Sequence, residues 1–196
     1  MNRLPSNADE WLRNLHIEFM KETDRGAAIV AAAMLEEVLK LLIRAKLVVA
    51  PKTDRSIIDG AKAPLNTFDA KIDAAYQMGL ISKFMASDLH VIRNIRNKFA
   101  HSPIGHTFES ESIRDAVRAL NEGSDYNKRN PSIRKNLGPP GGRGDFLAIA
   151  AWILYSLHTD IEATVRIEEM KPEFGYFDIE TLEKALRSRV SENEAT

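Results

Sequence analysis

The sequence contains no cysteine, and this absence removes a whole set of functions. Disulfide scaffolds, thiolate metal sites and cysteine nucleophiles are excluded, and a reducing compartment is favoured. Long hydrophobic runs are lacking too: the most apolar stretch, 146–157, is shorter than the roughly 20 residues that a membrane span needs. Residues 1–10 have no apolar core of a signal peptide. We therefore expect a cytoplasmic protein with no membrane association.

An excess of either charge is also lacking, because 27 lysines and arginines stand against 28 aspartates and glutamates. The formal net charge of -1 creates no global field toward nucleic acid or an anionic membrane, so any such preference must come from a local patch. Hydrophobic residues make up 44% of the 196 positions, which is enough to bury one sizeable core. The composition predicts that residues 1–196 form a single domain.

No segment of any length alternates like a strand, and apolar residues recur instead at helical spacing. Asp24 is the expected cap of a second helix. Glycine and proline mark the ends of the next two, since Gly79 ends a third helix and Pro103 limits a fourth. The predicted helices cover about 7–21, 24–49, 67–78, 82–102, 110–121, 145–170 and 178–190. The sequence therefore predicts an all-α fold, a compact bundle of six or seven helices.

A polar segment at 121–144 interrupts this pattern with three prolines and five glycines. Between Tyr126 and its end the segment carries basic residues and no acidic one: Lys128, Arg129, Arg134, Lys135 and Arg143. Loops of this length are typically functional or disordered. These cations form either a phosphate-binding surface, with Tyr126 stacking on a base, or the solvated face of a flexible loop.

The most informative segment is 93–101, Arg-Asn-Ile-Arg-Asn-Lys-Phe-Ala-His, within the fourth predicted helix. On a helical wheel the apolar residues gather on the side expected to face the core, and these are Ile92, Ile95 and Phe99. The polar residues occupy the opposite arc and its edges, and these are Arg93, Arg96, Asn97 and His101. One surface near the end of a helix therefore carries two guanidiniums, an amide and an imidazole.

This set of side chains is suited to metal-independent cleavage of RNA. An arginine such as Arg96 offers a planar fork for phosphate oxygens, and a histidine such as His101 can transfer a proton. Asn97 would orient the imidazole or the phosphate, while Arg93 and Lys98 would add phosphate contacts. The same spacing also fits a solvated helix end whose cations interact with the helix dipole.

Glu36 lies beside the apolar stripe of the helix predicted over 24–49. A partly buried carboxylate needs a partner, and Glu36 is a candidate to pair with Arg93 or Arg96 and orient them. The alternative is that Glu36 forms an ordinary salt bridge at a helix interface or is simply exposed. The five histidines show no metal-ligand spacing, and the glycines of 138–144 are not followed by the ending of a phosphate-binding loop. We expect no metal and no cofactor.

A short resemblance lies in residues 96–101, Arg-Asn-Lys-Phe-Ala-His. This segment resembles the R-N-x-x-x-H signature of the HEPN superfamily. A longer resemblance covers about residues 20–120. Its segments, in order, are 24–30, 35–37, 63–65 with Phe68, 71–73, 75–76, 79–81 and 88–89, leading into the motif. Over this length the chain resembles the mannitol-operon-repressor (MltR-like) family.

These resemblances imply two functions of different classes. MltR-like proteins are described as transcriptional repressors whose helical fold has no obvious DNA-binding motif, so regulation through a protein partner is implied. The HEPN signature implies a metal-independent endoribonuclease in which two motifs meet across a homodimer interface, with RNA as substrate. No helix-turn-helix pattern stands out in the sequence, so direct DNA binding is not expected. The longer match places regulation first and RNA cleavage second.

Overall fold

The computed structural model describes residues 14–15, 17–50, 56–101, 105–124, 142–170 and 183, with the side chains of 121–124 excepted. Within these ranges all regular structure is helical, so the predicted all-α class is confirmed. The helices with defined bounds are α2 (Asp24–Lys46), α3 (Phe68–Gln77), α4 (Lys83–His101), α5 (Glu111–Ser124) and α8 (Gly142–Ala163). The helix predicted over 178–190 lies outside the described residues, except for Glu183.

Side-chain caps determine where three of these helices begin. The Oγ1 of Thr23 accepts a hydrogen bond from the backbone N–H of Gly26, so Thr23 caps α2 and the expectation for Asp24 is wrong by one residue. Thr67 caps α3 in the same way, and Ser82 Oγ accepts from Met85 N at the start of α4. After α3, Gly79 takes a φ of 69°, which glycine tolerates best, as its predicted role at the helix end requires.

The bounds of α8 differ from the prediction at both ends. The helix begins at Gly142 rather than at Asp145, because Arg143 in its first turn is held by an ion pair to Asp24. It ends at Ala163, well before Met170. Residues 164–170 are not helical and run beside the end of α2, where Ile167 N donates to the carbonyl of Lys46 (2.9 Å).

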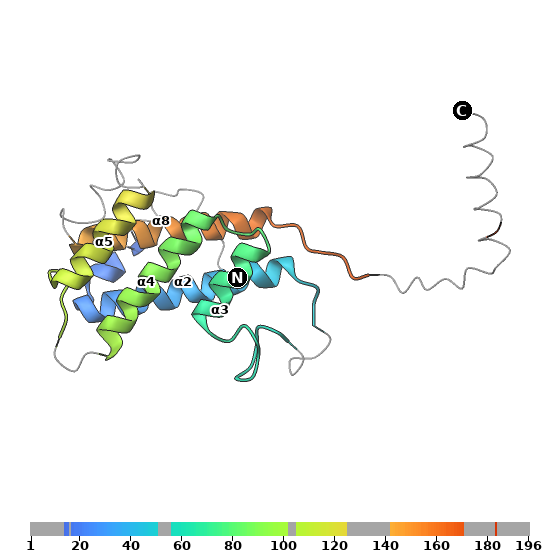
Figure 1. The fold of residues 1–196 in the computed structure, drawn as a ribbon, viewed down its shortest axis with the longest axis horizontal. Coiled ribbons are helices and arrows are strands. Elements are labelled where there is room, and N and C mark those ends of the chain that lie inside the picture. The colour runs from blue at the N-terminus through green and yellow to red at the C-terminus, as the bar shows by residue number, and fades with distance from the viewer. Residues whose placement is uncertain are drawn as a thin grey trace, which may run out of the picture.

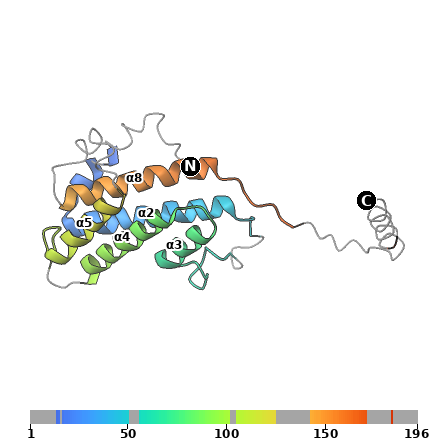
Figure 2. The ribbon, with the colours of Figure 1, turned by 45° about the horizontal axis from the view of Figure 1, so that its top comes forward.

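Helix α2 lies at the centre of the bundle, with α8 along one side and α4 and α3 on another (Figures 1 and 2). Helix α5 packs against both α4 and α8. Four alanines of α2 are almost completely buried and let a neighbouring helix approach closely: Ala27, Ala28, Ala31 and Ala32. Of the other helices, α8 makes the most extensive packing against α2.

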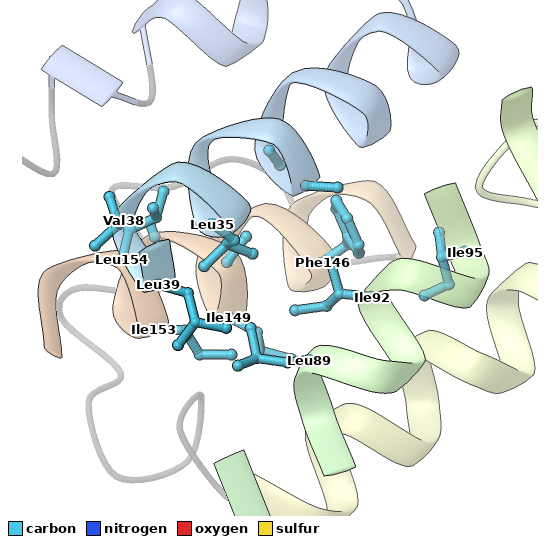
Figure 3. Packing of buried hydrophobic residues seen from close by; sticks show 14 of the residues in the cluster. Leu35, Val38, Leu39, Leu89, Ile92, Ile95, Phe146, Ile149, Ile153 and Leu154 are labelled. Carbon is cyan, nitrogen blue, oxygen red and sulfur yellow. The ribbon is translucent and has the colours of Figure 1, made fainter. Parts of the chain in front are cut away.

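The core forms where the apolar faces of α2, α4 and α8 meet (Figure 3). Leu35 of α2, Ile92 of α4 and Ile149 of α8 are fully buried there. Burial of each such side chain contributes roughly 1.5–3 kcal/mol to the free energy of folding before opposing terms. The predicted core residues Ile92, Ile95 and Phe99 are confirmed, since all three are buried.

The first turn of α4 departs from the expected apolar stripe. Phe84 is apolar and yet 74% exposed, because Met85 and Ala86 take the buried positions in that turn. At the other end of α4 the aromatic packing is tight. The ring of Phe99 lies 5.0 Å from that of Phe108, which in turn lies 5.1 Å from that of Phe146. These rings fix the end of α4 against α8 and the segment before α5.

Candidate functional site

Helix α4 carries polar side chains beside and opposite the face that is buried in the core. Arg93, Asn97 and His101 follow one another at intervals of four residues, so they form a row along the helix, and Arg96 lies beside the row. We refer to Arg93, Arg96, Asn97 and His101 as the α4 polar surface. The sequence predicts this surface, and the helical bounds of α4 place all four residues on one helix.

Two of the predicted cations are held by partners within the chain. Arg93 Nε lies 3.3 Å from Asp69 Oδ1 on α3, and Arg93 Nη1 donates to Asn94 Oδ1 (3.1 Å). Lys98 Nζ donates to the carbonyl oxygen of Ser112 in α5 (3.1 Å). These contacts tie α4 to α3 and α5. Arg93 and Lys98 therefore stabilise the packing of α4, whether or not they also contact phosphate as predicted.

Arg96, Asn97 and His101 differ from these two cations. Arg96 and Asn97 are half-buried and His101 is exposed, and none of the three makes a hydrogen bond or ion pair with a residue in the described ranges. The exposed Ala100 follows Arg96 by one turn, and its small side chain leaves the guanidinium accessible. An arginine, an amide and an imidazole at this end of α4 are thus not engaged by any residue that the structure describes.

Arg25 joins the same end of α4 from the first turn of α2. Its Nε donates to the carbonyl oxygen of Phe99 (2.7 Å). This carbonyl lies in the last turn of α4, where no backbone N–H of the helix is left to donate to it. The sequence gives no sign of this contact, because an arginine that reaches a backbone oxygen leaves no pattern of spacing. Arg25 adds a further guanidinium at the level of the α4 polar surface.

Arg143, for which a phosphate-binding surface and a solvated loop are the two alternatives from the sequence, belongs to neither: it lies in the first turn of α8 and is bound to groups of the chain itself. Its Nη1 donates to Asp24 Oδ1 (2.8 Å), while its Nη2 donates to the carbonyls of Phe19 (3.0 Å) and Glu22 (2.6 Å). Asp24 Oδ2 also accepts from the backbone N–H of Phe108 (3.0 Å). This connection joins the starts of α2 and α8 with the segment before α5, and its chemistry is structural.

Glu36 does not pair with Arg93 or Arg96; the alternative, an ordinary salt bridge at a helix interface, is confirmed. Glu36 Oε1 lies 2.8 Å from Lys71 Nζ on α3, and Lys71 also donates to the carbonyl of Asn66 (3.1 Å). The reason is the position of Glu36 along α2. It lies eleven residues beyond Arg25, or about 16 Å at 1.5 Å per residue, whereas the motif lies beside Arg25.

The other four basic residues predicted to contact nucleic acid lie outside the described residues, and they are Lys128, Arg129, Arg134 and Lys135. Their contribution to a phosphate-binding surface stays a prediction, as does that of Tyr126. Among the described residues, the basic side chains at this end of α4 are those of Arg25, Arg96 and the last-turn residues Lys98 and His101. Cations in the last turn of a helix interact favourably with its dipole.

Acidic side chains on α3 contact α4 one to three turns before the motif. The two ring nitrogens of His90 each lie 3.2 Å from a carboxylate, Nδ1 from Asp69 and Nε2 from Asp73. The i, i+4 spacing of the two aspartates could have indicated one acidic helix face from the sequence. In the part of the chain that the structure describes, no group of three or more histidine or carboxylate side chains is arranged to hold a metal ion.

None of the helices in the described ranges combines the length and apolarity needed to cross a membrane. Comparison of the chain with protein-family models, curated proteins and solved structures finds no match. The MltR-like and HEPN resemblances therefore stay predictions based on the residues that carry them.

Proposed function

We propose that the chain is an MltR-like regulatory protein, a repressor or co-regulator of transcription that acts through a protein partner. In this proposal the protein is a cytoplasmic homodimer, and the partner binds at the α4 polar surface. Direct DNA binding is not part of the proposal. The α4 polar surface is chosen because it contains Arg96, Asn97 and His101 of the R-N-x-x-x-H motif.

The residues that carry the MltR-like resemblance lie at junctions between helices, which supports the proposal. Arg25 ties α2 to the end of α4, Lys71 ties α3 to α2, and Gly79 provides the positive φ between α3 and α4. A shared fold needs the same residue types at such junctions. The resemblance therefore falls on positions where the fold depends on side-chain chemistry.

One observation carries the choice of surface. Arg96, Asn97 and His101 have no intramolecular partner in the described ranges, whereas the neighbouring Arg93 and Lys98 do. A half-buried guanidinium without a carboxylate or carbonyl partner is poorly compensated, and an acidic or carbonyl group of a bound molecule would compensate it. The α4 polar surface is thus suited to an acidic partner surface.

The accessibility of His101 favours a second candidate function, a HEPN-type endoribonuclease. In that reaction the imidazole of His101 takes the proton of a ribose 2′-hydroxyl, and the 2′-oxygen attacks phosphorus. The bond from phosphorus to the 5′-oxygen breaks, and that oxygen takes up a proton. Arg96 stabilises the charge on the phosphoryl oxygens, and Asn97 orients the phosphate. The products are a 2′,3′-cyclic phosphate and a 5′-hydroxyl.

Photo-crosslinking in cells tests the regulatory proposal. A photo-crosslinking amino acid replaces Ala100, which adjoins the α4 polar surface, or Ala119, an exposed alanine of α5 that serves as the matched control. We expect a discrete protein adduct from position 100 that is absent from position 119 and lost in the Arg96→Ala background. Equal adducts from both positions, or adducts that survive Arg96→Ala, would contradict the proposal.

Cleavage of mixed RNA in EDTA separates the two functions. The parent is compared with His101→Ala and with His106→Ala, a histidine outside the α4 polar surface, at matched folding and dimer content. Loss of a general acid–base group lowers the rate by a factor of about 100 to 10,000. Cleavage that only His101→Ala removes, with cyclic phosphate ends, would establish the nuclease. Absence of cleavage together with the specific adduct would support the regulator.

A further inference from the structure

A small hollow lies at the far end of α2 from the α4 polar surface. Its volume is about 240 Å³, and Arg44 in the last turn of α2 lies on its edge. Arg44 is nineteen residues from Arg25, or about 28 Å along the helix at 1.5 Å per residue. The hollow is therefore separate from the surface to which the proposed function is assigned, and the inference below does not depend on that function.

Apolar side chains line most of the hollow. They come from two segments, the residues that follow α2 and the turn at 56–59, and they include Leu47, Val48, Val49, Ile57 and Ile58. Val49 is 67% exposed, Ile57 44% and Val48 39%, although all three are β-branched apolar residues. Exposed apolar side chains that gather around one concave site are typical of a place where another molecule binds.

The walls of the hollow are held by hydrogen bonds within the chain. Ser56 Oγ accepts from the backbone N–H groups of Ile58 (3.2 Å) and Asp59 (3.0 Å), which fixes the turn. Arg44 Nη2 lies 2.6 Å from Asp59 Oδ1, so the turn is tied to α2. On the remaining side, Ile167 N donates to the carbonyl of Lys46 (2.9 Å). These bonds hold the described walls of the hollow in place relative to α2.

The charges around the hollow are not balanced. The carboxylate of Asp59 lies within ion-pair distance of Arg44 and of Lys40 (3.4 Å), so its charge is compensated. Arg166, on the wall formed by 164–170, is exposed and has no partner among the described residues. The guanidinium of Arg166 thus lies at the edge of an apolar hollow without a partner in the part of the chain that the structure describes. The complementary ligand has an anionic head and a short apolar body.

We propose that this hollow binds a small monocarboxylate with an apolar body, with the carboxylate on Arg166 and the body between Val48, Val49 and Ile57. The cavity volume limits the body to the size of a medium-length acyl chain or one aromatic ring. Arg166 belongs to the segment that continues from the bundle toward residues 171–196. Binding would therefore strengthen the attachment of that segment to the end of α2, beyond the bond from Ile167.

Methyl-resolved NMR of the full chain, titrated with octanoate, tests the proposal. We expect saturable shifts at the methyl groups of Val48, Val49 and Ile57, with the methyl groups of the core between α2, α4 and α8 unchanged. Arg166→Gln should weaken octanoate binding by about tenfold, the effect of losing one charge-assisted contact. The matched control is Arg114→Gln on α5, an exposed arginine far from the hollow, which should leave the affinity unchanged.

Two further probes identify which part of the ligand is recognised. Octan-1-ol keeps the apolar body without the charge, and acetate keeps the charge without the body. We expect both to bind at least about tenfold more weakly than octanoate. Equal binding of octan-1-ol would overturn the proposal and assign the hollow to an apolar segment. Shifts outside the hollow, or no saturation by octanoate at millimolar concentrations, would overturn it as well.

Ile57→Asp supplies a variant whose effect does not depend on Arg166. Ile57 is 44% exposed, so the substitution places a carboxylate at the hollow without removing a core side chain. We expect it to abolish octanoate binding through lost apolar contact and like-charge repulsion. Binding that survives Ile57→Asp would contradict the placement of the apolar body, and unchanged core methyl signals will show that the variant is folded.

Discussion

Arg25 in the first turn of α2 donates a hydrogen bond of 2.7 Å from its Nε to the carbonyl oxygen of Phe99, in the last turn of α4. The two residues are separated by 74 positions in the sequence. The bond satisfies a carbonyl that the helix itself leaves without a donor, and it fixes the turn that presents Arg96 and Asn97. The position of the α4 polar surface therefore depends on a residue of another helix.

Substitution of Arg25 tests this dependence. Arg25→Met keeps the aliphatic stem and removes the donor, so we expect the free energy of unfolding to fall by about 1 kcal/mol. Urea denaturation measures this change, and amide hydrogen exchange should become faster in the last turn of α4. Arg114→Met on α5 is the matched control. Exchange that is unchanged in the Arg25 variant would show that the bond does not fix the turn.

The contacts of Arg143 predict a larger loss. Its guanidinium donates to Asp24 and to two backbone carbonyls, so Arg143→Met removes three hydrogen bonds. The half-buried carboxylate of Asp24 loses its cation and keeps only the backbone N–H of Phe108 as a donor among the described residues. We expect a loss of about 2–3 kcal/mol in the free energy of unfolding. Arg143→Lys should recover only part, because an ammonium cannot reach all three oxygens in the same geometry. Full recovery by lysine would contradict a need for the planar fork.

The ion pair between Lys71 and Glu36 predicts strong coupling in a double-mutant cycle. The Lys71 side chain is only 5% exposed, so Glu36→Ala leaves a buried ammonium with one carbonyl partner. We expect Glu36→Ala to cost about 2–3 kcal/mol, and Lys71→Met in the same background to restore much of it. Thermal and urea unfolding of the four proteins measure the coupling. Additive effects would show that the pair makes no net interaction.

Asp88 predicts a dependence of stability on pH. It lies on the buried face of α4, and burial raises the pKa of its carboxyl from 3.8 to about 6. Between these values the folded state binds more protons than the unfolded state, so stability falls as pH rises through this range. Above pH 6 the ionised, buried carboxylate lowers the free energy of unfolding by its full amount, which is at most about 3 kcal/mol.

Asp88→Asn removes this titration. We expect the variant to be more stable than the parent at pH 7.5 and nearly equal to it at pH 4, with a flatter stability profile between pH 4 and 6. Urea unfolding at half-unit pH intervals measures the difference. A difference between variant and parent that is constant across this range would show that Asp88 does not titrate as its burial requires.

The helical faces were predictable from the sequence because periodicity is local. Ile92, Ile95 and Phe99 repeat at helical spacing, and burial on one side necessarily places Asn97 on the other. The same reasoning failed for Glu36, because its partner Lys71 comes from a helix whose position over α2 no local pattern specifies. The start of α8 could not be predicted either, since Arg143 is held by a residue 119 positions earlier.

The packing of α8 on α2 has a consequence for the order of folding during synthesis. The apolar stripe of α2, including Leu35 and Leu39, is completed by α8, which follows it by about a hundred residues (Figure 3). A nascent chain that contains α2 to α5 still exposes this stripe, and such contacts between distant segments form slowly. The core closes only when residues 142–163 have been synthesised, so the growing chain depends on its last long described helix to cover the apolar stripe of α2.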